Sequence, residues 1–375
     1  MKFLNCQTRR FALNFGKFRD NHSATLKNQT FQESYRKERN TIMRSLIIFL
    51  SVLFSIGALN IAQASCGTAT CPLNTNNYLQ AGWLQLGLVR EYIDQNQFYV
   101  GSSKASLGAF RQPDQEHDEV QTTNIRSIIK LQAGFTNRLS FAATLPFIHR
   151  EHVHISLEND EWESWNFSAL GDMVISGQYA ILLPPSDFKP YLSILLGAKL
   201  PSGVTDAINA DGEKAEVSLQ PGTGSYDALF GFNFRQRVLT APTLSGDLFA
   251  TMPLNIGITY RVNGKGNEDW RFGNTLIASV GTSYQMVKHA SLLLQINGKF
   301  QKKADPGMVS ITDSPPGNTG GKWIFASPGL SVQLNDSFSA YSYIQLPIYQ
   351  DVNGIQQTAP YYLQFGLTFG TGLLQ

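Results

Sequence analysis

Hydrophobic and polar residues alternate one by one along most of the chain after residue 78. In the segment 361–370, one set of positions is apolar (Tyr361, Leu363, Phe365, Leu367, Phe369), and the set between them is mostly small or polar (Tyr362, Gln364, Gly366, Thr368, Gly370). Segments 173–183 and 291–301 alternate in the same way. A period of two indicates β-strands, and one apolar face beside one small-polar face suits a sheet that separates two unlike solvents.

Twelve such segments are found, and the connections between them alternate in length. Five connections are short, at 136–138, 184–189, 239–243, 287–290 and 335–337, whereas the others run from about 8 to 28 residues. Outer-membrane barrels sort their loops in this way, while a soluble sandwich has no reason to. The predicted strands are 79–95, 124–135, 139–155, 170–183, 190–201, 226–238, 244–258, 272–286, 291–303, 322–334, 338–352 and 361–373.

The pattern predicts an all-β fold over residues 78–375: a closed antiparallel transmembrane barrel with short periplasmic turns and long extracellular loops. Strands in hydrocarbon must pair all their backbone groups, and closure achieves this by removing free edges. We expect aromatic residues near the predicted strand ends to lie at the membrane interfaces. These are Trp162, Trp165, Tyr260, Trp270, Trp323, Tyr349, Tyr361 and Tyr362.

The sequence of the N-terminal region indicates that the protein is exported across the inner membrane. An uncharged run from Ser45 to Leu59 ends in a small-x-small site at Ala62–Ala64, so residues 43–64 are predicted to be a signal peptide cleaved after Ala64. The alternative, a membrane anchor, is disfavoured because the run is short. Residues 1–42 lack any apolar period and precede a methionine of their own at Met43, so they are interpreted as a disordered or untranslated leader.

Residues 65–77 are predicted to form a periplasmic segment that carries a cysteine pair. Cys66 and Cys71 enclose four residues, and in an oxidising compartment such a pair favours a small disulfide over a metal site. Lipidation of Cys66 is the weaker alternative, because Gln63 stands where a lipoprotein signal normally has leucine.

The composition and the distribution of charge argue against an ordinary soluble domain and against a nucleic-acid-binding protein. Charged residues make up only 15% of the chain, well below the usual share for a soluble domain. The formal net charge is +2, but ten basic and three acidic residues precede Ser65, which leaves 20 basic and 25 acidic residues beyond it. Because the basic excess is confined to the N-terminus, we do not expect a nucleic-acid partner.

Three segments carry a resemblance to a known family: 169–180, 197–203 and 220–231. They resemble the outer-membrane family named after the meta-pathway of phenol degradation, whose members are transporter-like β-barrels. The resemblance implies a barrel and a transport role, but it does not specify a substrate. The C-terminal strand resembles a signal for the barrel-assembly machinery, although the chain ends in Leu-Leu-Gln375 rather than phenylalanine.

Alternation predicts which charged side chains point into the barrel. They are expected there because the interior is hydrated, whereas a charged side chain that faces lipid destabilises the barrel. They could line a polar, anion-tolerant conduit or, the interpretation we favour for most of them, form a paired network that stiffens the interior. The predicted lumen residues are Glu91, Arg126, Lys130, Arg150, Asp172, Lys199, Asp227, Arg235, Asp247 and Lys299.

A histidine-rich segment at 149–154 is the densest group of titratable residues. On a strand, His152 and His154 share one face, while His149 points the other way. They could ligate one metal at the barrel mouth, together with His117 or Asp118, although histidines at a rim are more often simply solvated.

These features predict a passive outer-membrane channel for small, in some cases hydrophobic or aromatic, molecules, with the lipid bilayer around it and no cofactor. The alternatives are a non-conducting structural or metal-responsive barrel and, as a minority hypothesis, an outer-membrane hydrolase. We expect no enzymatic activity, because the common nucleophile, zinc-protease and phosphate-loop motifs do not occur.

Overall fold

A computed structural model describes residue 79 and residues 81–111, 116–183, 188–244, 246, 249–312 and 314–372. The leader, the signal peptide and the Cys66–Cys71 segment predicted above all lie outside these residues, as does Asp247. Among the described residues, no helix is long and apolar enough to cross a membrane.

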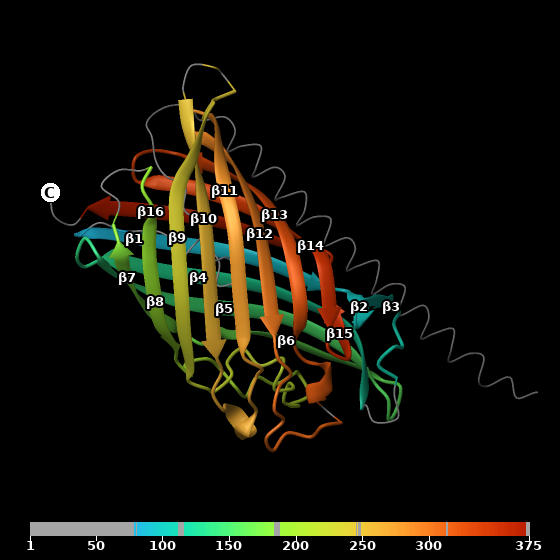
Figure 1. Cartoon of the computed structure of the whole chain (residues 1–375). Helices are drawn as coiled ribbons and strands as arrows, with labels where there is room; N and C mark the ends of the chain where they lie inside the picture. Colours follow the sequence, from blue (N-terminus) through green and yellow to red (C-terminus); the bar gives the residue numbers. More distant parts are fainter. Residues whose placement is uncertain are drawn as a thin grey trace, which may run out of the picture. The chain divides into compact units, whose positions relative to one another are not determined.

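Twelve strands of the described residues close into one antiparallel barrel (Figure 1). Each strand pairs with its neighbour in sequence around the wall, and β4 pairs with both β1 and β5, so the ladder has no free end. The twelve are β1 (Trp83–Gln95), β4 (His117–Gly134), β5 (Leu139–Ser156), β7 (Val174–Leu182), β8 (Tyr191–Lys199), β9 (Asp227–Pro242), β10 (Phe249–Val262), β11 (Thr275–Val287), β12 (Ala290–Gln301), β13 (Gly321–Gln333), β14 (Phe338–Val352) and β16 (Tyr362–Gly372).

The predicted barrel is confirmed, although several strand bounds differ. The turn predicted at 239–243 lies instead between Pro242 and Phe249, because β9 continues to Pro242 and β10 begins at Phe249. Two larger differences concern β4 and β5. First, β4 begins at His117, seven residues before the predicted start, and pairs with β5 as far as Ser156. Second, an additional strand, β6 (Trp162–Leu170), pairs with the half of β5 nearer the long loops, from Phe147 to Ile155. Strand β7 pairs with the half nearer the short turn, from Leu139 to Thr144. Asp172 therefore lies in a break between two strands that share one neighbour.

Burial in this barrel is the reverse of that in a soluble protein. Leucine and isoleucine side chains such as Leu294 (45% exposed) and Ile296 (43%) cover the outer wall, while Gln295 (4%) and Asn297 (3%) are buried inside. Gln178 and Gln364 are buried in the same way on β7 and β16. The face assigned as polar by alternation is thus the interior, and the apolar face is the outer wall, which matches a barrel surrounded by lipid.

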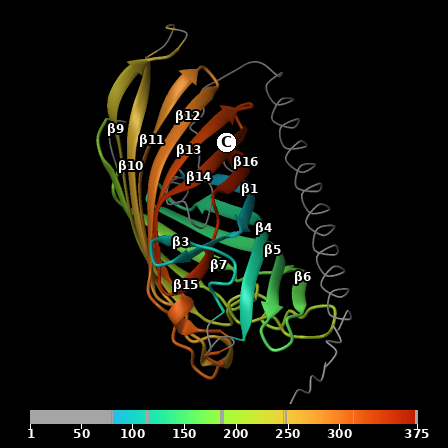
Figure 2. The ribbon, with the colours of Figure 1, turned by 90° about the vertical axis from the view of Figure 1, so that its right-hand side faces the viewer.

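Long connections and short extra strands gather at one end of the barrel, and short turns at the other (Figures 1 and 2). At the long-loop end, β15 (Ile355–Thr358), β2 (Gln97–Val100) and β3 (Ser103–Ala105) form a small separate sheet. Two short 3-10 helices, η2 (Asn267–Asp269) and η3 (Pro316–Asn318), lie in long loops at this end, and Asn318 of η3 accepts a hydrogen bond from the backbone of Ile355 in β15.

The interface role expected for the aromatic residues is wrong for three tryptophans. Trp165, Trp270 and Trp323 are 5%, 2% and 7% exposed and are buried inside, whereas Trp162 is 43% exposed. Trp165 packs against Ala215 and Leu219 of the connection between β8 and β9, residues 200–226, which we call the mouth loop. Trp165 and Trp270 therefore pack with loop residues, and Trp323 packs with Phe325 and Val352 of the wall, so none of the three contacts lipid headgroups.

Candidate functional site

Cavities occupy the barrel interior and are bordered by every strand of the wall. One, of about 380 Å³, is lined by side chains of β1, β4, β5 and β7 to β12, and it reaches Ser140 and Gln178 near the short-turn end. A second, of about 320 Å³, is lined by β1, β4, β11 to β14 and β16. Arg126, Lys299 and Phe272 line both cavities, so the two adjoin at these residues.

A third cavity, of about 210 Å³, continues toward the long-loop end. It is lined by His117, Glu119 and Arg150 from the wall, by Glu216, Ser218 and Leu219 of the mouth loop, and by β15. It shares Gln95, Ser218 and Gln356 with the second cavity. The interior therefore holds a chain of adjoining spaces, the outermost of which the mouth loop borders.

Most of the lumen residues predicted by alternation line these spaces. Those in direct contact with a cavity are Glu91, Arg126, Lys130, Arg150, Lys199, Asp227 and Lys299. Arg235 is partly buried on the same face of β9 as Asp227, and Tyr191 is its partner across the ladder. Asp172 lies beside Lys199, and Asp247 is outside the described residues.

Lys199 is the centre of a buried ionic cluster. Its Nζ atom lies 3.0 Å from both Asp172 Oδ2 and Asp227 Oδ2 and donates a 2.9 Å hydrogen bond to Ser225 Oγ. Thr223 Oγ1 also contacts Lys199 Nζ and donates to Asp172 Oδ2 at 2.7 Å. The two carboxylates thus balance the positive charge of Lys199, and its ammonium group is fully hydrogen-bonded. Burying an ion is costly unless it is paired and hydrogen-bonded in this way.

The same cluster fixes both ends of the mouth loop. Asp172 accepts hydrogen bonds from the backbone N–H groups of Gly203 (3.0 Å) and Thr223 (2.9 Å). At this crossing the backbones of Gly203 and Gly222 are so close that a Cβ on Gly203 would lie 2.6 Å from Gly222 Cα. The three segments that carry the family resemblance therefore meet at one point, where they anchor the loop.

One further ion pair and the hydrogen bonds of Arg150 support the stiffening interpretation. Arg126 Nη1 lies 3.0 Å from Glu91 Oε2 on the neighbouring strand. Arg150 donates from Nε to Asn124 Oδ1 at 2.6 Å and from Nη1 to the carbonyl oxygen of Leu219 in the mouth loop. Lys299 is different, since its Nζ atom lies 4.9 Å from the centre of the Trp323 ring, within the range of a cation–π contact.

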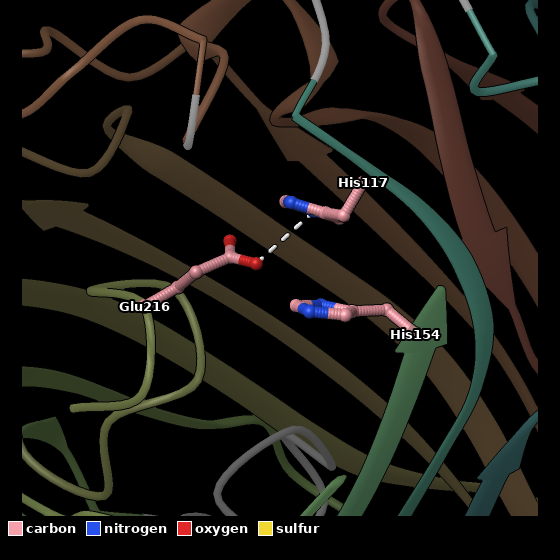
Figure 3. Close-up of side chains that lie close together, drawn as sticks. All are labelled: His117, His154 and Glu216. Atoms are coloured by element: carbon pink, nitrogen blue, oxygen red, sulfur yellow. Dashed lines mark ion pairs between the residues drawn. The ribbon is translucent and has the colours of Figure 1, made fainter. Parts of the chain in front are cut away.

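The histidines form a compact cluster at the long-loop end. Figure 3 shows two of them, His117 and His154, beside Glu216. The rings of His117 and His154 stack with centroids 4.4 Å apart, and His152 Nε2 lies 3.4 Å from His154 Nδ1. The extended pairing of β4 brings His117 to this position, because it lies opposite Ser156 in the ladder. The prediction that His152 and His154 share a face is consistent with their contact, and His117 joins them.

Three carboxylates surround these histidines. Glu216 Oε1 lies 3.1 Å from His117 Nε2, Glu163 Oε2 lies 2.8 Å from His154 Nε2, and Glu119 Oε2 lies 3.6 Å from His152 Nε2. Sequence reasoning did not identify these glutamates, since Glu119 and Glu163 lie on segments predicted as loops and Glu216 is a loop residue 62 positions after His154. Asp118, the alternative partner considered above, instead pairs with Arg111 at 3.1 Å.

The cluster lies beyond the part of β5 that a membrane requires. An outer-membrane strand needs about 9–11 residues, whereas β5 has 18 and starts at a short turn, so its last six residues project past the bilayer. His152 is completely buried there, between Trp165 and the neighbouring histidines. Burial lowers the pKa of His152 to about 4, which keeps its imidazole neutral at physiological pH.

Comparisons with known proteins agree on the fold. The COG4313 outer membrane channel from Pseudomonas putida F1 is similar in structure, with a TM-score of 0.56 at 12% identity over 79% of this chain and 98% of that one. The Pseudomonas putida toluene transporter TodX also matches, with a TM-score of 0.41 at 9% identity over 81% and 93% of the two chains. At these levels of sequence identity, the first similarity establishes the barrel fold alone. The second similarity has a low TM-score and supports no conclusion.

Sequence comparisons do not assign this chain to a family. No protein-family model matches this chain, and no curated protein matches it. The fold is thus that of an outer-membrane β-barrel, and its function must be argued from the interior itself.

Proposed function

We propose that this protein is an outer-membrane channel for the passive movement of small molecules, within the transporter-like family that its three motifs resemble. One observation carries the proposal: the adjoining interior cavities are bordered by all twelve strands of the barrel. A barrel that served only as a scaffold would be expected to fill this space with side chains, because unfilled volume forfeits packing energy.

The lining supports a solute that combines an apolar body with negative charge. The two larger cavities are lined by five basic residues and two acidic ones, so the lining of these two cavities carries an excess of positive charge. The basic residues are Arg126, Lys130, Lys199, Arg261 and Lys299, and the acidic ones are Glu91 and Asp227. Apolar side chains such as Ile128, Leu195 and Phe272 lie between them. Small aromatic or aliphatic carboxylates have this combination of properties.

The proposed setting follows from the outer wall. Exposed leucine, isoleucine and phenylalanine side chains face outward along the strands, which is stable only in a bilayer. Insertion by the barrel-assembly machinery, after export by the predicted signal peptide at 43–64, belongs to the same proposal. We propose no catalytic role and no cofactor for the interior.

Planar-bilayer recording tests the channel directly. We expect steady single-channel steps from the purified protein and, in a salt gradient, a reversal potential that shows a preference for anions. Lys299→Glu should weaken this preference, because Lys299 lies where the two large cavities adjoin. Lys322→Glu is the matched control, since Lys322 is 60% exposed and pairs with Asp351 away from these cavities.

A closed barrel is the competing function, and the mouth loop is the observation that favours it. Its residues Ala215, Val217 and Leu219 are buried against Trp165 and Trp270, as a lid over the interior would be. If the protein gave no conductance steps, and vesicles containing it did not swell in benzoate, the channel proposal would be wrong and the scaffold function would replace it.

A further inference from the structure

We infer that His117, His154 and Glu216 form a binding site for a divalent transition-metal ion, with Zn²⁺, Ni²⁺ and Cu²⁺ as the matching class. Each residue offers one ligand atom, and these atoms lie within 4.8 Å of one another. Two imidazoles and one carboxylate are a ligand set that zinc accepts with an open fourth position. The site is independent of whether the barrel conducts.

The three ligands come from three separate parts of the chain (Figure 3). His117 begins β4, His154 lies near the end of β5, and Glu216 belongs to the mouth loop. Bonds to a metal would therefore tie the mouth loop to the β4–β5 hairpin, at a point remote from the anchor at Lys199. Because the ligands are far apart in sequence, the site exists only in the folded barrel.

The surroundings of His154 orient one of its nitrogens for a ligand. His154 Nε2 lies 2.8 Å from Glu163 Oε2. In the tautomer that donates from Nε2 to this carboxylate, Nδ1 carries the lone pair for a metal, and it faces His152 Nε2 at 3.4 Å. A carboxylate behind a histidine is the usual second partner of a metal-bound imidazole, and it increases the basicity of the ligand. The ring of Trp165, 4.8 Å away, supports His154 from the side.

The charge of the side chains around the histidines also favours the binding of a cation. Glu119, Glu163 and Glu216 contact the cluster, and their ion pairs here are with histidines whose rings are mostly buried. Arg150, which lines the same cavity, directs its guanidinium to Asn124 and Leu219 instead. A divalent ion at this place would add positive charge beside these three carboxylates.

Binding requires a small rearrangement that the geometry permits. The stacked rings of His117 and His154 are nearly parallel, 14° apart, and must splay so that each points a nitrogen at the same ion. Tetrahedral zinc holds its ligand nitrogens about 3.3 Å apart, so the ligand atoms need to approach by roughly 1–1.5 Å. Side-chain rotation supplies this movement, and the adjacent cavity of about 210 Å³, which His117 and Glu216 line, provides access.

A second set of ligands, Glu119, His152 and Glu216, lies in the same cluster and fits less well. His152 has no exposed surface, and its Nδ1 atom is within hydrogen-bond distance of Thr122 Oγ1 at 2.9 Å. Its Nε2 atom faces His154 Nδ1. A metal on His152 would have to displace the Thr122 contact or the His154 contact at a ring with no exposed surface, whereas a metal on His154 displaces only the 3.4 Å contact with His152, so we assign the site to His117 and His154.

Metal titration of the full-length protein in detergent, without a polyhistidine tag, tests the site. Ni²⁺ and Cu²⁺ quench nearby indoles, so the fluorescence of Trp165 reports binding, and Zn²⁺ should compete without quenching. We expect a saturable signal that Trp165→Phe removes. His117→Ala and His154→Ala should each weaken binding by about 10- to 100-fold or more.

His149→Ala is the matched control, because His149 lies on the same strand but bonds to Ser168 and pairs with Glu151 on the other side. It should bind metal as the unchanged protein does. Retained heat-modifiable migration in electrophoresis shows that each variant still forms a barrel. Unaltered affinity in both the His117 and His154 variants overturns the proposal, and so does a loss that occurs only in His152→Ala and Glu119→Gln.

Trypsin digestion gives a second readout in the unmodified chain. Lys214 lies in the mouth loop two residues before Glu216, and its side chain is 40% exposed. Zn²⁺ should slow cleavage after Lys214, because the metal fixes the loop to the wall, and Glu216→Gln should abolish this protection. Equal protection in the Gln variant would contradict the assignment of Glu216 as a ligand.

Discussion

Replacing Lys199 with methionine tests whether the ionic cluster holds the mouth loop in place. The side chains of Lys199, Asp172 and Asp227 are only 6%, 5% and 2% exposed, and both carboxylates lie 3.0 Å from the ammonium group. Methionine preserves the apolar stem but leaves two buried carboxylates without their cation. Breaking a buried ion pair in this way costs about 3–5 kcal/mol.

The free energy of unfolding, measured by guanidinium titration of the protein in phospholipid vesicles, provides the assay. Lys322→Met is the control, because its 3.6 Å pair with Asp351 is exposed and should contribute about 0–1 kcal/mol. Adding Asp172→Asn to the Lys199 variant should recover part of the loss, since one uncompensated charge is removed. If the Lys199 and Lys322 variants lost the same stability within 1 kcal/mol, the anchoring role would be refuted.

Three further changes test other parts of the structure. Gly203→Ala should destabilise the barrel by about 1–3 kcal/mol, because its Cβ would overlap the backbone of the crossing loop, whereas Gly317→Ala meets open space and should have little effect. Trp165→Ala should cost about 3–5 kcal/mol and make the mouth loop more sensitive to trypsin; unchanged cleavage would argue against its packing role. Leu294→Arg, on the outer wall, should cost about 2–4 kcal/mol in vesicles but much less in detergent, and an equal cost in both would contradict a lipid-facing position.

Alternation along the chain was sufficient to predict the barrel wall. The segment predicted at 338–352 has the bounds of β14, and the segment predicted at 139–155 differs from β5 by one residue. The assignment of Gln295 and Asn297 to one face and Leu294 and Ile296 to the other is also confirmed. These features depend on side chains two positions apart, which is information that a strand carries locally.

The long-loop end could not be predicted in the same way. Trp165 and Trp270 were expected at the membrane interface but are buried under loops, because an aromatic residue near a strand end can face lipid or pack inward with equal local signal. The pairing that brings Asp172 and Asp227 to Lys199 likewise requires the crossing of two loop ends, which no periodicity records.

Residue alternation and the cost of unpaired backbone in lipid were enough to predict the twelve-stranded wall, its two faces and most of the charged side chains on the inner face. The inward path of the mouth loop, and the meeting of Glu216 with His117 and His154, could be seen only in three dimensions. Loop placement depends on contacts between residues far apart in sequence, and these form only once the closed wall holds the loop ends at fixed positions.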